Sequence, residues 1–163
     1  MPLIPDQHRK KAAAAALAVA IAAPAEGIRQ WAYYDPPGIL TVCEGHTGAD
    51  VVKGKKYSLA ECRAYLTDDM RKAIDWVDRC QPGLPVEILA AFGDATFNIG
   101  ATVACGTDAV STAAKRLRAH NYAAACDELL KWNKARVAGF LVALPGLTTR
   151  RTAERALCMQ GLT

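Results

Sequence analysis

The feature that most constrains the fold is an uncharged, alanine-rich run near the N-terminus. Residues 12–25 read AAAAALAVAIAAPA. Alanine is the strongest helix former, so we expect a helix that continues to about Gly27. Four residues with basic side chains directly precede the run: His8, Arg9, Lys10 and Lys11.

The same run is a marginal membrane segment. A span needs about 20 apolar residues, and Leu17, Val19 and Ile21 together contribute only about −1 to −2 kcal/mol of insertion free energy. It should therefore engage the export machinery but be held weakly in lipid, with the basic cluster in the cytoplasm and everything after residue 25 outside. Two alternatives are a signal peptide cleaved at Ala23-Pro24-Ala25 and an ordinary alanine-rich helix of a cytosolic protein.

Composition fits one domain, with room for two lobes. Of the 163 residues, 52% are apolar, which is enough to build a core. The net charge of +4 is small, and no stripe of basic residues with interleaved aromatic residues is present, so we expect no nucleic-acid partner. A mildly basic surface tolerates an anionic polymer, although solubility alone explains this charge equally well.

Six cysteines are spread through the chain after the alanine-rich run. None has the spacing of a zinc site, so we expect no metal. An even number of dispersed cysteines suits an oxidising compartment, the alternative being six small buried residues in a reducing cell. Many pairings are possible, and we expect three local bridges: Cys43–Cys62, Cys80–Cys105 and Cys126–Cys158.

Capping and turn residues predict a mostly helical chain with one small β region. Turn residues around Pro36-Pro37-Gly38 predict a hairpin within residues 30–47. Ser58 and Glu61 form a capping box for a helix that reaches about Arg79. Pro85 suits the first turn of an apolar helix that ends at Gly100.

Three more segments complete the α+β prediction of two lobes. Thr107 or Asp108 should cap a helix to about His120, and Asn121 should cap another that continues through Lys131. A loop from Trp132 should then lead into a last helix over about residues 149–159.

Two carboxyl groups and a hydroxyl lie where a helix end feeds the predicted hairpin. Glycoside hydrolysis needs one protonated and one ionised carboxyl group. Glu26 has apolar neighbours that should raise its pKa by desolvation, so we expect it to be the general acid. Asp35, in the turn, should be wetter and act as general base, and Thr41 should position a water. Taken singly, such residues are usually surface or capping residues.

The joint pattern E-x8-D-x5-T resembles the phage lysozyme family, glycoside hydrolase family 24. The resemblance covers about residues 26–160. Within the family, the chain is most similar to the lambdoid endolysins with a signal-anchor-release segment. It implies a two-lobe lysozyme fold with a glycan cleft and hydrolysis of the β-1,4 bond between N-acetylmuramic acid and N-acetylglucosamine of peptidoglycan. Four further stretches carry it: Gly27-Ile28-Arg29, Gly45-His46-Thr47-Gly48, FNIG at 97–100 and PGLTTRRTAERALC at 145–158.

The subgroup implies an anchor that is retained and slips out of the bilayer. Residues 1–25 would then be the anchor and residues 26–163 the catalytic domain, moving from the host inner membrane to the periplasm. Cleavage after Ala25 would instead place an α-ammonium beside Glu26 and lower its pKa. Residues 1–25 contain no cysteine, so disulfide exchange from the anchor is not available.

Several other residues are weighed against ordinary structural roles. His46 resembles the family's cleft histidine, with a structural role expected. Arg150 or Arg151 is a candidate partner for Glu26, the alternative being a solvated helix face, and Asn98 either lines the cleft or serves its helix. Glu44 is expected on the strand surface. The candidates for stacking on sugars are the three tryptophans Trp31, Trp76 and Trp132. Core packing is expected for at least two of them.

Two other functions remain open for such a chain. One is a non-catalytic, membrane-tethered glycan-binding module, against which the intact pair of acids argues. The other is a transglycosylase on the same fold, against which Asp35 argues because it is a base that can activate water. We expect no cofactor and a monomeric protein.

Overall fold

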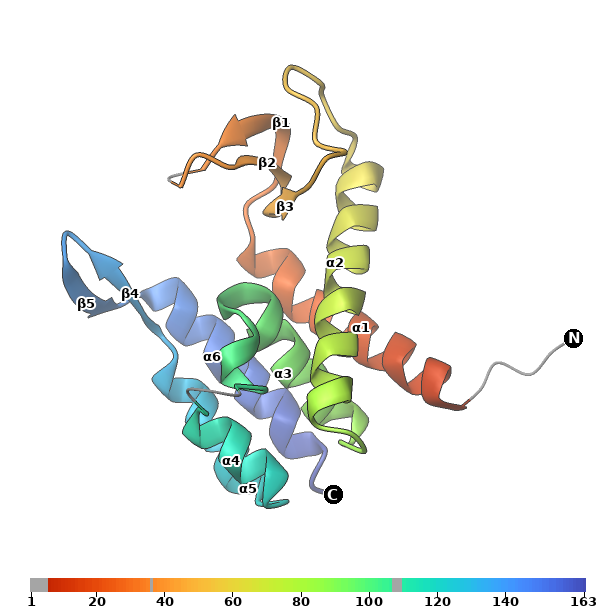
Figure 1. Cartoon of the computed structure of the whole chain (residues 1–163), viewed down its shortest axis with the longest axis vertical. Coiled ribbons are helices and arrows are strands. Elements are labelled where there is room, and N and C mark those ends of the chain that lie inside the picture. Colours follow the sequence, from red (N-terminus) through yellow and green to blue (C-terminus); the bar gives the residue numbers. More distant parts are fainter. Residues whose placement is uncertain (1–5, 36, 107–109) are drawn as a thin grey trace, which may run out of the picture.

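The computed structural model describes residues 6–35, 37–106 and 110–163, which form a helical lobe and a smaller β lobe linked by the long helix α2 (Figure 1). Each lobe has its own hydrophobic core. The elements, in chain order, are α1 (Asp6–Ala25), β1 (Arg29–Tyr34), β2 (Leu40–Cys43), β3 (His46–Thr47), α2 (Leu59–Cys80), α3 (Val86–Ile99), a 3-10 turn (Ala101–Val103), α4 (Thr112–Arg118), α5 (Tyr122–Glu128), a second 3-10 turn (Leu129–Lys131), β4 (Lys134–Val137), β5 (Phe140–Ala143) and α6 (Pro145–Gln160).

The alanine-rich run forms α1, which packs into the helical lobe. Ala14, Ala18 and Ala22 recur every four residues, so they form one face of the helix, and with Ala15 they are buried against α2 and α3. Their small side chains allow α1 to approach its neighbours closely. None of the helices in the described ranges is both long enough and apolar enough to cross a membrane.

Helices α2 and α3 begin where the capping residues predict. The Ser58 hydroxyl accepts from the Glu61 backbone N–H at 3.1 Å, and the Glu61 carboxylate accepts from the Ser58 N–H at 2.7 Å. α3 starts directly after Pro85 and ends at Gly100. Within α3, Gly93 lies against Ile74 of α2, and a side chain at Gly93 would collide with Ile74. The glycine therefore sets the close approach of the two helices.

The predicted hairpin is present and carries a third strand. β1 pairs with β2, which pairs with β3, and both pairings are antiparallel. Tyr33 lies opposite Thr41, and Val42 lies opposite His46. The core of this lobe contains Val42 and Tyr57.

The C-terminal half differs from the prediction in two places. The predicted loop after Trp132 is a second hairpin, β4–β5, and α6 begins at Pro145, because proline is well suited to the first helical position. The cap of α4 is Ser111, whose hydroxyl accepts from the Ala114 backbone N–H at 3.0 Å. The predicted caps Thr107 and Asp108, and Pro36 of the hairpin turn, lie outside the described residues.

Three disulfides join the same cysteine pairs that the sequence led us to expect. Cys43–Cys62 ties β2 to α2 in the β lobe. Cys80–Cys105 and Cys126–Cys158 lie in the helical lobe, the latter fully buried between α5 and α6.

Loss of the Cys126–Cys158 bridge should lower the free energy of unfolding by about 3–4 kcal/mol. The bridge closes a loop with a sequence separation of 32 residues, and a loop of that size restricts the unfolded chain by about this amount. Urea titration of Cys126→Ala/Cys158→Ala against the oxidised wild type measures the difference. Cys126→Ala alone should lose nearly as much, since it also breaks the bridge. Stability equal to wild type in both variants would contradict the prediction.

Candidate active site

Glu26 follows α1 directly and faces the first residues of α6. Its backbone N–H still donates to the Ala22 carbonyl at 3.0 Å, so the end of α1 sets its position. Its carboxylate accepts a hydrogen bond from Nη1 of Arg150. The expected apolar surroundings of Glu26 are therefore wrong, because its principal partner is a charged guanidinium.

Arg150 is itself held by a buried carboxylate. Its Nε and Nη2 donate to the two oxygens of Asp94 at 2.9 and 2.8 Å, and Asp94 is fully buried in α3. Although burial lowers the pKa of Arg150, its hydrogen bonds to Asp94 and Glu26 raise that pKa above the usual value. Arg150 is thus a fixed positive charge beside Glu26, and the alternative of a solvated helix face is wrong.

Arg151 turns to a different partner. It is fully buried, and its Nη2 donates to Oδ1 of Asn98 at 2.7 Å. The same nitrogen lies 2.8 Å from Glu154 Oε1 as an ion pair without hydrogen-bond alignment. Burial, together with the nearby carboxylate of Asp94, raises the pKa of Glu154. Of the two candidate arginines, Arg150 pairs with Glu26, and Arg151 holds Asn98 in place.

Asp35 and Thr41 meet across the turn between β1 and β2. Asp35 Oδ1 accepts from the Ile39 backbone N–H at 2.8 Å, which orients the carboxylate. The Thr41 hydroxyl donates to the Ile39 carbonyl at 3.0 Å and lies 3.4 Å from Asp35 Oδ2. Glu26 and Asp35 flank β1, since Glu26 lies shortly before the strand begins and Asp35 directly follows its last residue.

His46 is part of a structural network in the β lobe. Its Nδ1 lies 2.6 Å from Asp69 and its Nε2 lies 3.2 Å from Asp50. Its ring stacks on Tyr65 with 3.9 Å between the centroids. With both nitrogens occupied and the side chain buried, His46 fits the expected structural role.

A hollow of about 370 Å³ lies between the lobes, and its lining does not include Glu26, Asp35 or Thr41. The β2–β3 turn, the middle of α2 and the end of α3 line it. Phe97, one of the lining residues, also lies under the Arg150 guanidinium at 5.8 Å from its ring centroid. Phe97 is thus the lining residue that contacts Arg150, the partner of Glu26.

Two expectations about single side chains are wrong. Glu44 is 4% exposed in the β2–β3 turn, and neither of its carboxylate oxygens has a partner among the described residues. Burial raises the pKa of Glu44. Trp31 and Trp76 are 56% and 54% exposed, and Trp132 alone of the three packs against the core.

Sequence reasoning missed Asp94 and Glu154, which support Arg150 and Arg151 from inside the fold. A usable signal existed for Asp94, because a charged residue in the apolar run VEILAAFGDATFNIG needs a buried partner. The cluster of Cys43, Glu44 and Cys62 has atoms within 4.8 Å of one another, but both sulfurs are used in the disulfide and neither can bind a metal as thiolate.

Comparison with known proteins matches the chain to one family. The phage lysozyme family profile matches residues 23–154. The SAR-endolysin of Bacteriophage PS119 is 35% identical over 136 residues, which are 83% of this chain and 77% of that protein. The SAR-endolysin of Escherichia phage Mu is 38% identical over 136 residues, covering 81% and 72%. The solved endolysin of Escherichia coli O157:H7 phage FAHEc1 superposes with a TM-score of 0.72 at 28% identity, covering 88% of this chain and 90% of that one.

Proposed function

Because the chain belongs to the phage lysozyme family, we propose that it cleaves the β-1,4 bond between N-acetylmuramic acid and N-acetylglucosamine in peptidoglycan. The family makes it a glycoside hydrolase that acts in cell lysis; the bond and the residue roles below are our proposal. The single observation that carries the proposal is Glu26 at the end of α1, held by the buried Arg150–Asp94 pair.

Glu26 is the proposed general acid. In this role the carboxyl group of Glu26 gives its proton to the leaving glycosidic oxygen. As the proton passes to the leaving glycosidic oxygen, a carboxylate forms next to the fixed charge of Arg150. That charge stabilises the new anion, so the proton transfer becomes more favourable in the transition state.

Asp35 is the proposed general base, with Thr41 as its positioning residue. The Ile39 N–H fixes one carboxylate oxygen, and the other oxygen and the Thr41 hydroxyl can hold one water between them. If the reaction inverts the anomeric centre, the carboxyl groups of Glu26 and Asp35 should lie about 6.5–9.5 Å apart across the bound sugar.

Product analysis tests this proposal against its two alternatives. Purified peptidoglycan is digested with the protein, and mass spectrometry identifies the ends released. Hydrolysis gives N-acetylmuramic acid at a free reducing end, as we expect. Anhydro-muropeptides would identify a transglycosylase, and wall binding without released fragments would identify a glycan-binding module; either result overturns the proposal.

For residues 1–25 we propose the role of a signal-anchor-release segment ahead of the catalytic domain at 26–163. The names of the relatives and the marginal apolarity of residues 12–25 support it. On this proposal the segment first lies in the host inner membrane with its N-terminus in the cytoplasm. After release to the periplasm, it packs as α1 through Ala14, Ala18 and Ala22.

Leucine on the exposed face of α1 should trap the protein in the membrane. Ala12, Ala13, Ala16 and Ala20 are exposed, so leucine there leaves the buried alanine face intact. Four leucines add about −1 to −2 kcal/mol of insertion free energy, which shifts the ratio of bound to released protein by about fivefold to thirtyfold. Membrane fractionation and a lysis assay measure this. Glutamine at the same four positions is the matched control and should be released freely; equal release of both variants would contradict the idea.

A further inference from the structure

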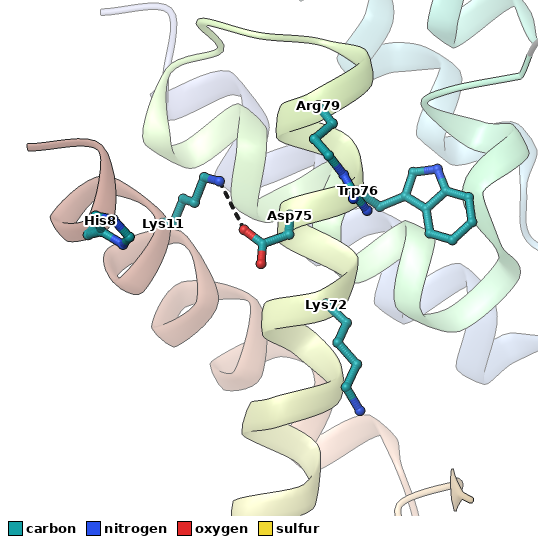
Figure 2. Close-up of a pocket in the computed structure, with 6 residues that line it drawn as sticks. All are labelled: His8, Lys11, Lys72, Asp75, Trp76 and Arg79. Carbon is teal, nitrogen blue, oxygen red and sulfur yellow. Dashed lines mark hydrogen bonds and ion pairs between the residues drawn. The ribbon is translucent and has the colours of Figure 1, made fainter.

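One face of α2 carries an exposed aromatic residue between two cations. Lys72, Trp76 and Arg79 are spaced four and three residues apart, so they lie along one stripe of the helix. All three are exposed, Trp76 by 54%. They line a hollow of about 480 Å³ together with Asp75 and two residues of α1, His8 and Lys11 (Figure 2).

This hollow adjoins the one between the lobes, because Lys72 and Trp76 are lining residues of both. The helix rises about 1.5 Å per residue, so the path from Asp69 to Arg79 is about 15 Å long. A glycan strand that leaves the cleft in this direction therefore lies along α2 for more than one sugar ring.

The charge of the stripe is positive. Lys11 lies 3.0 Å from Asp75 and 3.1 Å from Asp78, so this one cation of α1 offsets part of the negative charge of the two acids. Lys72 lies 2.9 Å from Asp69, but its side chain is 68% exposed and can reach a ligand. Arg79 takes part in none of the ion pairs within the described ranges. Figure 2 shows the indole of Trp76 extending away from the α2 backbone.

We propose that Lys72, Trp76 and Arg79 form a distal binding surface for the peptidoglycan strand beyond the cleft. Trp76 stacks on a sugar ring, since an indole offers a large apolar face with low loss of side-chain freedom. Arg79 and Lys72 pair with the carboxylates of the stem peptides, a contact for which the guanidinium is especially suited. This inference rests on the proposed function and names a further part of its substrate site.

The test compares long and short substrates. For long, uncross-linked strands that carry stem peptides, Trp76→Ala should raise KM about 3- to 10-fold and leave kcat unchanged. Lys72→Ala/Arg79→Ala should also raise KM on these strands, but not on strands stripped of their peptides. On short fragments that fill only the cleft, Arg79→Ala should match wild type, because Arg79 is the one residue of the three that does not line the hollow between the lobes. Trp76→Phe should recover part of the loss on long strands.

Controls separate this inference from the proposed function. Phe140→Ala removes an exposed aromatic side chain of β5 that lines neither hollow, and its KM should match wild type. An unchanged KM for Trp76→Ala on long strands, with activity intact, overturns the distal surface and leaves the proposed function standing. Loss of binding to phosphatidylglycerol vesicles without any change in KM would instead assign the stripe to a lipid surface, which also overturns the proposal. Active Glu26→Gln would reject the proposed function itself.

Discussion

Glu26→Gln should lower the rate of cell-wall clearing by about 10²- to 10⁴-fold. That range is the usual contribution of a general acid, and an amide cannot supply the proton. Glutamine keeps the size of the side chain, and its carbonyl oxygen can still accept from Arg150. The variant should therefore fold and bind walls as wild type does. A turbidity assay on chloroform-treated cells measures the rate.

The matched control for this variant is Glu87→Gln. Glu87 lies in the first turn of α3, and it is not among the carboxylates that pair with Arg150 in the described residues. The clearing rate of Glu87→Gln should be within about twofold of wild type, since substitutions away from the active site and the core have small effects. A Glu26→Gln protein that clears walls as fast as this control would remove Glu26 from the mechanism.

Arg150→Ala should lower the free energy of unfolding by about 3–5 kcal/mol. Removing one partner of a buried ion pair leaves the other charge without compensation, and Asp94 is fully buried. Glu26 would lose its partner at the same time, so activity should also fall. Urea titration followed by circular dichroism measures the loss of stability, and the clearing assay measures the loss of activity.

Arg155→Ala is the control on the same helix. Arg155 pairs with Asp127 at 2.7 Å, but both side chains are well exposed, so its loss should cost less than about 1 kcal/mol. Arg150→Lys keeps the charge but not the two parallel bonds to Asp94. Its free energy of unfolding should therefore lie between those of Arg150→Ala and Arg155→Ala. Equal stability of Arg150→Ala and Arg155→Ala would contradict the buried pair.

Helices with explicit start and stop signals could be predicted from the sequence. Ser58 and Glu61 cap α2, and Pro85 and Gly100 bound α3, because these residues satisfy or interrupt backbone hydrogen bonds locally. The β4–β5 hairpin could not, because its strands are exposed on almost every residue and therefore lack the apolar alternation that marks a half-buried strand. Its turn also uses Ala138 at φ 48°, where asparagine or aspartate is usual.

The candidate site also contains residues that could be predicted from the sequence and residues that could not. Glu26, Asp35 and Thr41 could be selected as candidates because local spacing around one hairpin groups them. The partners of Arg150 could not, because its contacts to Asp94 and Glu26 depend on how α3, α6 and the end of α1 pack in three dimensions. Glu44 shows the same limit, since residue type alone does not distinguish a buried turn from an exposed one.

The central claim is that a water attacks the glycan after Glu26 protonates the leaving oxygen. Digestion of peptidoglycan in ¹⁸O-labelled water, followed by mass spectrometry of the fragments, tests it most directly. The wild type should place one labelled oxygen at the anomeric carbon of each new muramic acid end, and Glu26→Gln should release almost no labelled ends. Fragments formed without the label would contradict hydrolysis at this site.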